Sequence, residues 1–513
     1  MNQKQYVDLI AEIETRFPVQ HWKYRGIPVW PVARIEARSE SLRSDPNGNT
    51  DGTPRNRGGR AITQLLRYVF SPLIDKVRNC ADFDQEALRL RPVDVLFLGD
   101  NTSSDFIAGV WRERYNAPVA EAFARAGNTS LVLQPGERQR LPRSQVTYSV
   151  NWVDRWSRIV TKFLVGPDED FPGFPEFERF LHAEGINLAC FDRKAMKQSA
   201  ARIYYMSHFF GRILARTKPK LVVVVSYYHE IGYALLHACR TRSILTVDIQ
   251  HGGQGGAHEA YNRWHGLPSD GYSVLPSIFW NWSQRDANYI REWCTPQEAW
   301  HDSIWGGHPQ LESWFDETNL QTIAFDKQIA SLKECIGGNF DILVPLQDLE
   351  RYTERWNALA RLVEASPPNW RWWLRRHPSA AYNSGNSLNS LFAVKRTSFL
   401  TDQASLLPLP ALLRNMNCIL CLLSSTAFEA SEFGHRTIFI TEDARDLWPD
   451  LIESGQADVI TDMKVLLRHM QELQTSRNSG YREKPPSLDQ VARKLITRAT
   501  AYGKFANPVD TEP

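Results

Sequence analysis

Two short stretches in the second half of the chain combine side chains that bind anions. The first is Arg-Arg-His after an apolar run, and the second is three hydroxyl residues followed by a helix-like segment with a glutamate. Arginine neutralises phosphate, a helix that opens on Ser or Thr offers backbone N–H groups to an anion, and a carboxylate can bind a ribose diol. This pattern predicts a nucleotide site whose residues are Arg375, Arg376, His377, Ser424, Ser425, Thr426 and Glu429.

These residues also have ordinary structural interpretations. The hydroxyl residues would cap the helix that follows them, although capping and phosphate binding use the same geometry. Glu429 would favour the helix dipole from the first turn. His377 would be a strand-end residue held by the turn at Pro378. Only one of Arg375 and Arg376 would face a ligand, because neighbouring strand residues point to opposite faces.

Groups suited to acid–base chemistry gather in the first half of the chain, again directly after apolar runs. Asp100, Glu230 and His251 each lie in a loop after such a run, and four glycines within five positions follow His251. A carboxylate is ready as a base near neutral pH, so the two acids rank ahead of His251, and His258 and Glu259 come next. Asp100 would otherwise cap its loop. The candidate catalytic residues are Asp100, Glu230, His251 and His377.

Alternating apolar runs and helical stretches must position these residues. Near-continuous apolar runs at 93–98, 221–226, 244–249 and 342–346 are typical of parallel strands buried on both faces, and helix-like segments separate them. Ligands of such sheets bind outside the carboxyl ends of the strands. The predicted fold class is therefore α/β, with two Rossmann-like parallel-sheet domains.

The expected domain boundaries follow changes in composition. The segment 39–60 has Leu42 as its one large apolar residue and is expected to be a flexible linker. The basic, amphipathic segment 61–78 is expected to form a helix that packs on its own domain or lies on an anionic membrane surface. The predicted parts are an N-terminal extension at 1–80, a first α/β domain at 81–315, a second at 316–487, and a C-terminal helix and tail at 488–513.

Bulk composition narrows the class of protein. The chain has 513 residues, 42% of them hydrophobic, and a formal net charge of +2, which suits two or three soluble domains without a general attraction to nucleic acid. No apolar run approaches the roughly 18 residues of a membrane span, and the N-terminus lacks a signal-peptide core. The seven cysteines are scattered, so a disulfide framework is not expected and a cytoplasmic location is. Cys418 and Cys421 would point to opposite faces of a strand and pack in the core.

Three parts of the sequence resemble bacterial capsule and lipopolysaccharide glycosyltransferases. They are residues 225–228 with 246–252, residues 374–378, and residues 424–434. The last two are similar to the HP and Ser/Thr-rich motifs of the bacterial sialyltransferase and polysialyltransferase group. In that group these motifs surround the phosphate of a CMP-sugar, and the resemblance implies the same roles for His377, Ser424 and Ser425.

One difference from that group concerns the base. The group places an acidic pair and a glycine before its HP motif, whereas the segment 341–374 has Asp348, Glu350 and Glu354 without such a triplet. Neither the donor sugar nor the position of the base follows from the resemblance. It implies instead a GT-B architecture, in which two Rossmann-like domains face each other across a cleft, here with an N-terminal helical extension.

The function implied by the resemblance is transfer of a sugar from a nucleotide-sugar donor to a bacterial surface glycan, either capsule or lipopolysaccharide O-antigen. The first domain would bind the acceptor and the second the donor, without metal or cofactor. A CMP-sugar is slightly favoured over a UDP- or GDP-sugar, and peripheral contact with the inner face of the inner membrane is expected. The alternatives are a nucleotide-sugar 2-epimerase of the same fold and a non-catalytic subunit of a glycan-assembly complex.

Overall fold

The protein divides into two compact units, Met1–Pro309 with Pro485–Pro513, and Gln310–Lys484. The predicted division instead lay at 315 and 487. Asp100, His377, most of the predicted linker and the predicted basic helix at 61–78 lie outside the described residues. The computed structural model describes residues 3–43, 90–99, 104–107, 109–135, 145–163, 169–254, 256, 258–294, 300–347, 352–376, 399–475 and 485–505.

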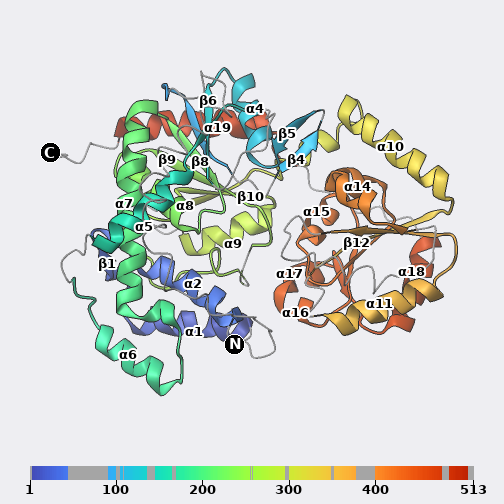
Figure 1. The fold of residues 1–513 in the computed structure, drawn as a ribbon, viewed down its shortest axis with the longest axis horizontal. Helices are drawn as coiled ribbons and strands as arrows, with labels where there is room; N and C mark the ends of the chain where they lie inside the picture. Colours follow the sequence, from blue (N-terminus) through green and yellow to red (C-terminus); the bar gives the residue numbers. More distant parts are fainter. Residues whose placement is uncertain are drawn as a thin grey trace, which may run out of the picture. The chain divides into compact units, whose positions relative to one another are not determined.

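The first unit is built on a seven-stranded parallel sheet with the order β11-β10-β9-β8-β3-β6-β7 (Figure 1). From the central strand β3 the chain builds outward through β6 and β7, then returns to β8 and builds the other half. This is the doubly wound order, and its switch point lies between β3 and β8. The strands are β3 (Val95–Leu98), β6 (Ser130–Gln134), β7 (Thr147–Ser149), β8 (Leu221–Val225), β9 (Leu245–Ile249), β10 (Ile278–Asn281) and β11 (Asp302–Trp305).

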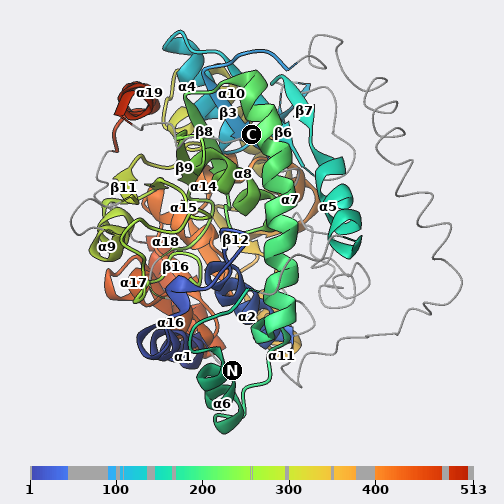
Figure 2. The ribbon, with the colours of Figure 1, turned by 90° about the vertical axis from the view of Figure 1, so that its left-hand side faces the viewer.

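Helices cover both faces of this sheet because its strands are apolar on both sides. Leu96 and Leu98 belong to the core that contains α7 and α8, whereas Phe97 points the other way, onto Phe123 of α4. The long helix α7 runs along the sheet in Figure 2, and the C-terminal helix α19 packs on α4. The helices are α4 (Asn116–Arg125), α5 (Asn151–Phe163), α6 (Phe174–Ala183), α7 (Arg193–Thr217), α8 (Glu230–Arg240), α9 (Gln284–Cys294) and α19 (Leu488–Phe505).

Two N-terminal helices, α1 (Gln3–Arg16) and α2 (Trp30–Arg43), belong to the same core. Between them lie the short strands β1 (Lys23–Tyr24) and β2 (Ile27–Pro28). Trp22 and Trp30 are fully buried and pack edge-on against each other and against Phe177 of α6. Aromatic burial of this size ties the N-terminal helices to the unit as a structural part of it.

The second unit repeats the doubly wound order in a six-stranded parallel sheet, β14-β13-β12-β15-β16-β17. Its switch point lies between β12 and β15. The fold therefore confirms the predicted α/β class with two parallel sheets. The strands are β12 (Phe340–Pro345), β13 (Trp370–Arg375), β14 (Phe399–Leu400), β15 (Cys418–Cys421), β16 (Thr437–Phe439) and β17 (Ala457–Val459).

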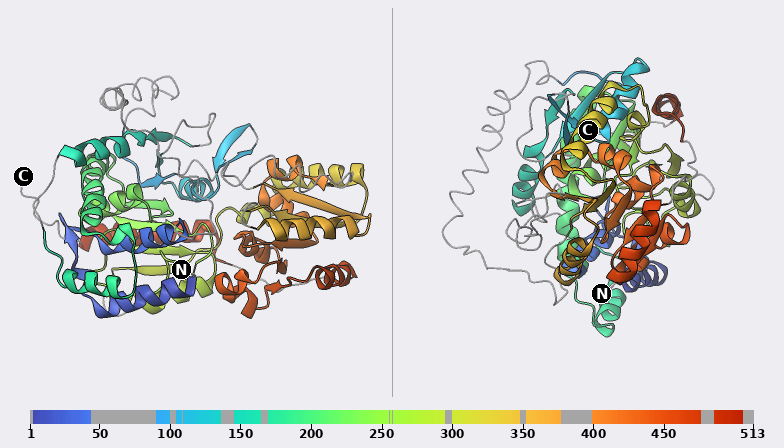
Figure 3. Two further views of the ribbon diagram at one scale, coloured as in Figure 1. Left: turned by 60° about the horizontal axis from the view of Figure 1, so that its bottom comes forward. Right: turned by 90° about the vertical axis from the view of Figure 1, so that its right-hand side faces the viewer.

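Helices lie on both faces of the second sheet (Figure 3). A separate hydrophobic core lies on each face. One contains α10 and α14, and the other α11 and α18. Cys421 belongs to the first core and Cys418 to the second, which confirms that the two thiols point apart. The helices are α10 (Leu320–Ile336), α11 (Thr353–Ala365), α13 (Asp402–Leu406), α14 (Leu409–Asn415), α15 (Thr426–Glu432), α16 (Asp443–Leu447), α17 (Pro449–Glu453) and α18 (Met463–Thr475).

No helix among the described residues is long and apolar enough to cross a membrane.

A buried histidine makes the first unit sensitive to mild acid. His301 Nδ1 donates to the carbonyl of Pro276 (2.7 Å) and its Nε2 accepts from the N–H of Tyr272 (3.1 Å), so the ring is neutral. Burial lowers the pKa of His301 to about 4. In the unfolded chain the pKa of the same ring is about 6.5. The unfolded state therefore binds more protons, and stability is lost as pH falls from about 6.5 to about 4.

We expect the urea midpoint of the first unit to fall between about pH 7.5 and about pH 5, and His301→Asn to reduce that fall. The comparison between wild type and variant isolates this ring from the other titrating groups. Equal pH dependence of the two proteins would show that His301 does not contribute.

Candidate active site

The chain turns sharply at the switch point of the first unit. Ser226, directly after β8, has φ +61°, a left-handed conformation that is uncommon for a residue other than glycine. Three residues of loop then lead into α8, where Gly232 lies so close to the preceding loop that an added Cβ would come within 2.3 Å of the Tyr227 carbonyl oxygen. Strained backbone of this kind is common at functional sites, because the rest of the fold must hold it in place. The turn presents Tyr228 at the carboxyl edge of the sheet.

The hydroxyl of Tyr228 lies between two histidines from the neighbouring loop. Its Oη is 3.0 Å from Nε2 of His251 and 3.3 Å from Nε2 of His258. His251 lies two residues after β9, and its carbonyl accepts a hydrogen bond from the hydroxyl of Tyr115 (3.1 Å). Three side chains that exchange protons therefore meet where a doubly wound sheet binds its ligands. We refer to Tyr228, His251 and His258 as the relay.

The hydrogen bonds define the direction of the relay. His258 Nδ1 accepts from the N–H of Ala260 (3.2 Å), and burial lowers the pKa of His258, so its single ring proton is on Nε2. That N–H donates to the Tyr228 oxygen. A phenol has one proton to donate, and we assign it to the 3.0 Å bond with Nε2 of His251. In this assignment Nε2 of His251 is the accepting atom of the relay.

A buried polar layer supports the relay from below. Asp248 of β9 is fully buried and accepts hydrogen bonds from the Tyr261 hydroxyl (2.8 Å) and the N–H of Tyr227 (3.1 Å). Burial raises the pKa of Asp248 to about 8, so this carboxyl group is largely neutral near pH 7. It fixes the backbone next to Tyr228 without placing a negative charge beneath the relay.

Gln250 fixes the start of the glycine-rich loop that carries His251. Its Nε2 donates to the Gly252 carbonyl (2.9 Å) and to Asp286 of α9 (2.9 Å), while its Oε1 accepts from the N–H of Trp282 (2.7 Å). Gln250 itself is fully buried. The loop is therefore attached on both sides of His251, through Gln250 and through the bond from Tyr115.

Glu230, the first residue of α8, is engaged elsewhere. Its carboxylate forms an ion pair with Arg202 of α7. Burial raises the pKa of Glu230, and so does the negative charge of Asp154, while the charge of Arg202 lowers it. The structure thus brings Glu230 to the predicted edge but pairs it with an arginine, and its catalytic role stays a prediction. Asp100 lies outside the described residues.

The switch point of the second unit brings two loops together. The side-chain oxygen of Gln347, two residues after β12, accepts the N–H of Leu423 after β15 (3.2 Å). In the same turn the Ser424 hydroxyl donates to Thr426 Oγ1 (2.9 Å) and accepts from the Thr426 N–H (3.2 Å). Two of the three predicted hydroxyl residues therefore lie where a ligand of this sheet would bind.

The predicted arginines have protein partners. Arg375 is buried, and its guanidinium donates to the carbonyls of Ala404 (2.6 Å) and Leu407 (2.5 Å) around α13. Arg376 is half-exposed and pairs with Asp402 (2.7 Å). This agrees with the expectation that the two side chains point to different sides, but neither contact shows a ligand-binding role, which stays a prediction.

The remaining predicted donor residues lie on or beside α15. Ser425 precedes this helix without a capping bond from its side chain, and Glu429 is buried in the helix. Their roles, like that of His377 outside the described residues, stay predictions. Among the described residues no group of three or more His, Cys, Asp and Glu side chains is placed to hold a metal ion.

Tyr228 and Gln347 are site residues that the sequence analysis did not select. Tyr228 lies three residues after β8 and Gln347 two residues after β12, and this position after a strand is the signal that would have found them. Charged and imidazole groups were expected to do the chemistry at such positions, so a phenol and an amide were not predicted.

Two doubly wound α/β units, each with polar side chains at its switch point, define a protein of the GT-B fold. Comparison with solved structures finds the same fold. The UDP-GlcNAc 2-epimerase from Methanocaldococcus jannaschii aligns with 79% of this chain and 99% of its own at 12% identity, with a TM-score of 0.50.

Two further structures of lower TM-score are similar over comparable lengths. The UDP-GlcNAc 2-epimerase from Neisseria meningitidis, solved with UDP-GlcNAc, covers 79% of this chain and 99% of its own at 15% identity and a TM-score of 0.45. The glycosyltransferase SnogD from Streptomyces nogalater covers 79% of this chain and 99% of its own at 12% identity and a TM-score of 0.38. No protein-family model and no curated protein matches the sequence. At such identities the likeness establishes the fold alone, and the activity must be inferred from the residues of the site.

Proposed function

We propose that the protein is a glycosyltransferase that moves a sugar from a nucleotide-sugar donor to a hydroxyl group of a bacterial surface glycan. The observation that carries the proposal is the relay of Tyr228, His251 and His258 at the switch point of the first unit. An attacking hydroxyl must lose its proton, and a positioned imidazole near neutral pH is suited to receive it. The GT-B fold and the hydroxyl turn of the second unit supply a place for the nucleotide.

The proposed step has a defined path for the proton. The acceptor oxygen forms a bond to the anomeric carbon of the donor sugar, and the bond from that carbon to the phosphate oxygen breaks. Tyr228 Oη takes the acceptor proton while it passes its own proton to Nε2 of His251. The nucleotide leaves with the electron pair, and the imidazolium of His251 later loses its proton to water. His258 holds Tyr228 in place through its Nε2–H.

The donor side of the proposal rests on the second unit. Ser424, Ser425, Thr426 and His377 would surround the phosphate, with Arg376 as the more accessible of the two arginines. Preorganised donors of this kind stabilise the charge that develops on a leaving phosphate. A CMP-sugar is favoured by the motif resemblance and a UDP-sugar by the similarity to the UDP-GlcNAc 2-epimerase from M. jannaschii.

A nucleotide-sugar 2-epimerase is the second candidate. It is favoured by the activity of the M. jannaschii protein, a UDP-GlcNAc 2-epimerase whose fold this chain shares. An epimerase also moves protons with paired acid–base groups, but it needs no acceptor. A non-catalytic subunit would bind a nucleotide sugar without turning it over.

One experiment separates these three functions. Purified protein is screened for stabilisation by CMP-, UDP-, GDP- and dTDP-sugars, and the stabilising donors are incubated with and without an acceptor glycan. Release of nucleotide that depends on acceptor is expected. Formation of a 2-epimer without acceptor would favour the epimerase. Stabilisation without turnover across all acceptors would contradict catalysis altogether.

Glu429 tests the predicted ribose contact. If its carboxylate holds the diol, Glu429→Gln should weaken nucleotide binding by about 1–3 kcal/mol, the value of a lost hydrogen bond to a charged group. Isothermal titration calorimetry measures this. Glu432→Gln, at the other end of α15, serves as the control and should leave affinity unchanged. If Glu429→Gln changes thermal stability alone, by about 0.3–1 kcal/mol, the residue acts on the helix dipole instead.

A further inference from the structure

The segment that carries His258 is an irregular turn held by its surroundings. The His258 carbonyl accepts the N–H groups of Tyr261 (3.0 Å) and Asn262 (2.7 Å), which wraps the chain around this residue. The Ala260 carbonyl accepts the hydroxyl of Tyr227 (2.6 Å), next to Tyr228 in the sequence. The position of His258 against the relay therefore depends on what fixes residues 260 to 265.

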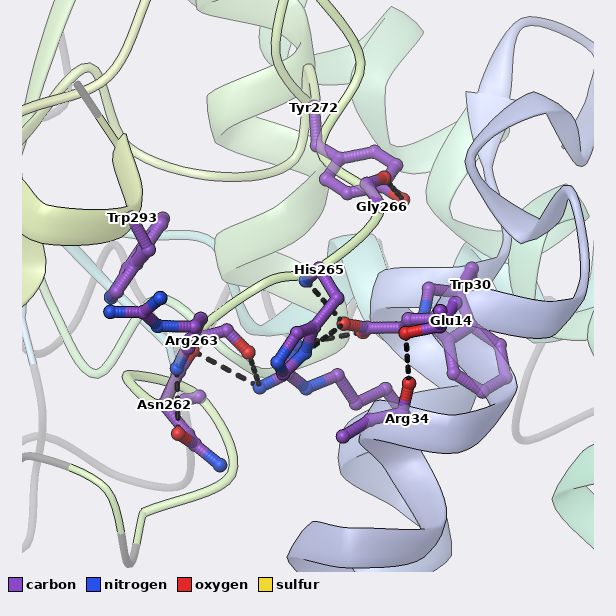
Figure 4. A network of polar contacts seen from close by, with 12 residues as sticks. Glu14, Trp30, Arg34, Asn262, Arg263, His265, Gly266, Tyr272 and Trp293 are labelled. Atoms are coloured by element: carbon purple, nitrogen blue, oxygen red, sulfur yellow. Dashed lines mark hydrogen bonds and ion pairs between the residues drawn. The ribbon is translucent and has the colours of Figure 1, made fainter. Parts of the chain in front are cut away.

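Arg34, on the N-terminal helix α2, holds this segment in place (Figure 4). Its Nη2 donates to the carbonyls of Asn262 (3.1 Å) and Arg263 (3.2 Å), and its guanidinium lies 3.8 Å from the centre of the Trp264 ring. The guanidinium thus contacts three consecutive residues, two through hydrogen bonds to their carbonyls and the third through its charge against the indole ring. Arg34 is 1% exposed, so these contacts are fully shielded from water.

Glu14 of α1 completes the contact. Its Oε1 accepts from Arg34 Nη1 (2.8 Å) and from the indole of Trp30 (2.9 Å), and its Oε2 accepts the N–H of His265 (2.8 Å). Burial by itself would raise the pKa of Glu14, but the charge of Arg34 and the bonds from His265 and Trp30 outweigh it and lower the pKa. The carboxylate is therefore charged and fully bonded.

The segment also passes close to α1 itself. A Cβ added to Gly266 would lie 3.2 Å from the backbone oxygen of Glu14. On the opposite side the hydroxyl of Tyr289 on α9 donates to the side chain of Asn262 (2.8 Å). The turn is thus held between the N-terminal helices and α9, as a rigid support for a functional side chain would be.

A buried ion pair is weak evidence for stability, because removing two charges from water offsets most of their attraction. The buried pair of Arg34 and Glu14 can instead fix the positions of the groups that it contacts. We propose that Arg34 and Glu14 are positioning residues that set His258 against Tyr228, so that the N-terminal helices form part of the active-site architecture. The expected loss of turnover in an Arg34 variant rests on the proposed function. The expected change in the tautomer of His258 does not.

The test measures the tautomer of the His258 ring directly. In protein labelled with 15N-histidine, NMR of the wild type should show His258 as a single neutral tautomer with its proton on Nε2. Arg34→Met should abolish that preference, and Arg193→Met should not. Arg193 is a matched control in the same unit, since it too joins a carboxylate (Asp170), a backbone carbonyl (Glu169) and an aromatic ring (Phe171).

Arg34→Lys keeps the proposal testable if Arg34→Met fails to fold. Lysine retains the charge opposite Glu14 but not the planar fork that bonds two carbonyls, so it should keep the fold and still lose the single tautomer. An unchanged His258 tautomer in a folded Arg34 variant would overturn the proposal.

Turnover is measured separately. Misplacement of His258 should lower kcat by about 10²-fold while leaving donor affinity unchanged. A changed tautomer in a protein that turns over no nucleotide sugar would uphold the positioning role and reject the proposed function. A changed tautomer with unchanged turnover would reject the role of His258 in the reaction.

Discussion

Replacing His251 with alanine is expected to lower kcat by about 10²–10⁴-fold, the contribution of a positioned general base. The reason is that Nε2 of His251 is the final acceptor of the relay and is bonded to Tyr228 at 3.0 Å. Donor affinity should remain near that of wild type, because the predicted donor contacts lie in the second unit. Steady-state kinetics and calorimetric titration together measure both quantities.

The relay also predicts how substitutions combine. Tyr228→Phe removes the hydroxyl that links the two histidines and should cost about as much as His251→Ala, and the double variant should be little worse than either, since residues that act as a unit are not additive. The exposed His182 of α6 provides a control, and His182→Ala should leave kcat unchanged. If His251→Ala retains near-normal transfer, the base lies elsewhere, and Asp100 and Glu230 become the next residues to test.

Replacing Asp341 with asparagine is expected to destabilise the second unit by about 3–5 kcal/mol, because it leaves the buried guanidinium of Arg371 without its carboxylate partner. Asp341 is 2% exposed, accepts two bonds from Arg371 (2.7 and 2.8 Å), and pairs with Lys333 (2.8 Å). Burial would raise the pKa of Asp341, but these partners outweigh burial and lower it. Chemical denaturation of the variant measures the loss.

Position in the fold predicts that this loss spares the chemistry. Asp341 lies at the start of β12, at the opposite end of the strand from the switch point, so kcat of the folded fraction should be unchanged. The pair of Arg436 (48% exposed) and Asp458 (23% exposed) is more accessible to water and gives a matched control, and Asp458→Asn should cost about 1 kcal/mol or less. An equal loss of unfolding free energy in the two variants would show that burial does not make the Asp341 ion pair more important for stability.

Strand periodicity predicted the frame of both sheets well, because buried parallel strands are continuous apolar runs. The runs at 221–226 and 342–346 correspond to β8 and β12. Strand β10 and its neighbour β11 at the sheet edge were not predicted, since their tryptophan-rich segment has no distinctive period. The hairpin of β4 (Ser104–Ile107) and β5 (Val110–Glu113), which follows β3, also escaped prediction because neither strand is apolar.

The site was predicted less completely, because residue type gives the chemistry available but not the partner. Arg375 has the right chemistry for phosphate, yet its guanidinium bonds two backbone carbonyls. The link between Tyr228 and His251 joins residues 23 positions apart and depends on how two loops meet at a sheet edge. Likewise no pattern in the N-terminal helices indicates that Arg34 reaches Asn262, 228 residues away.

If the chemistry takes place at the relay, its two histidine rings must respond when the acceptor binds. The 15N-histidine protein is titrated with the stabilising nucleotide sugar and then with the acceptor glycan, and the ring signals of His251 and His258 are followed by NMR. We expect both signals to shift when the acceptor is added, because its hydroxyl would bond to Tyr228 between them. If acceptor binds and is turned over while neither ring responds, the relay is not the catalytic centre.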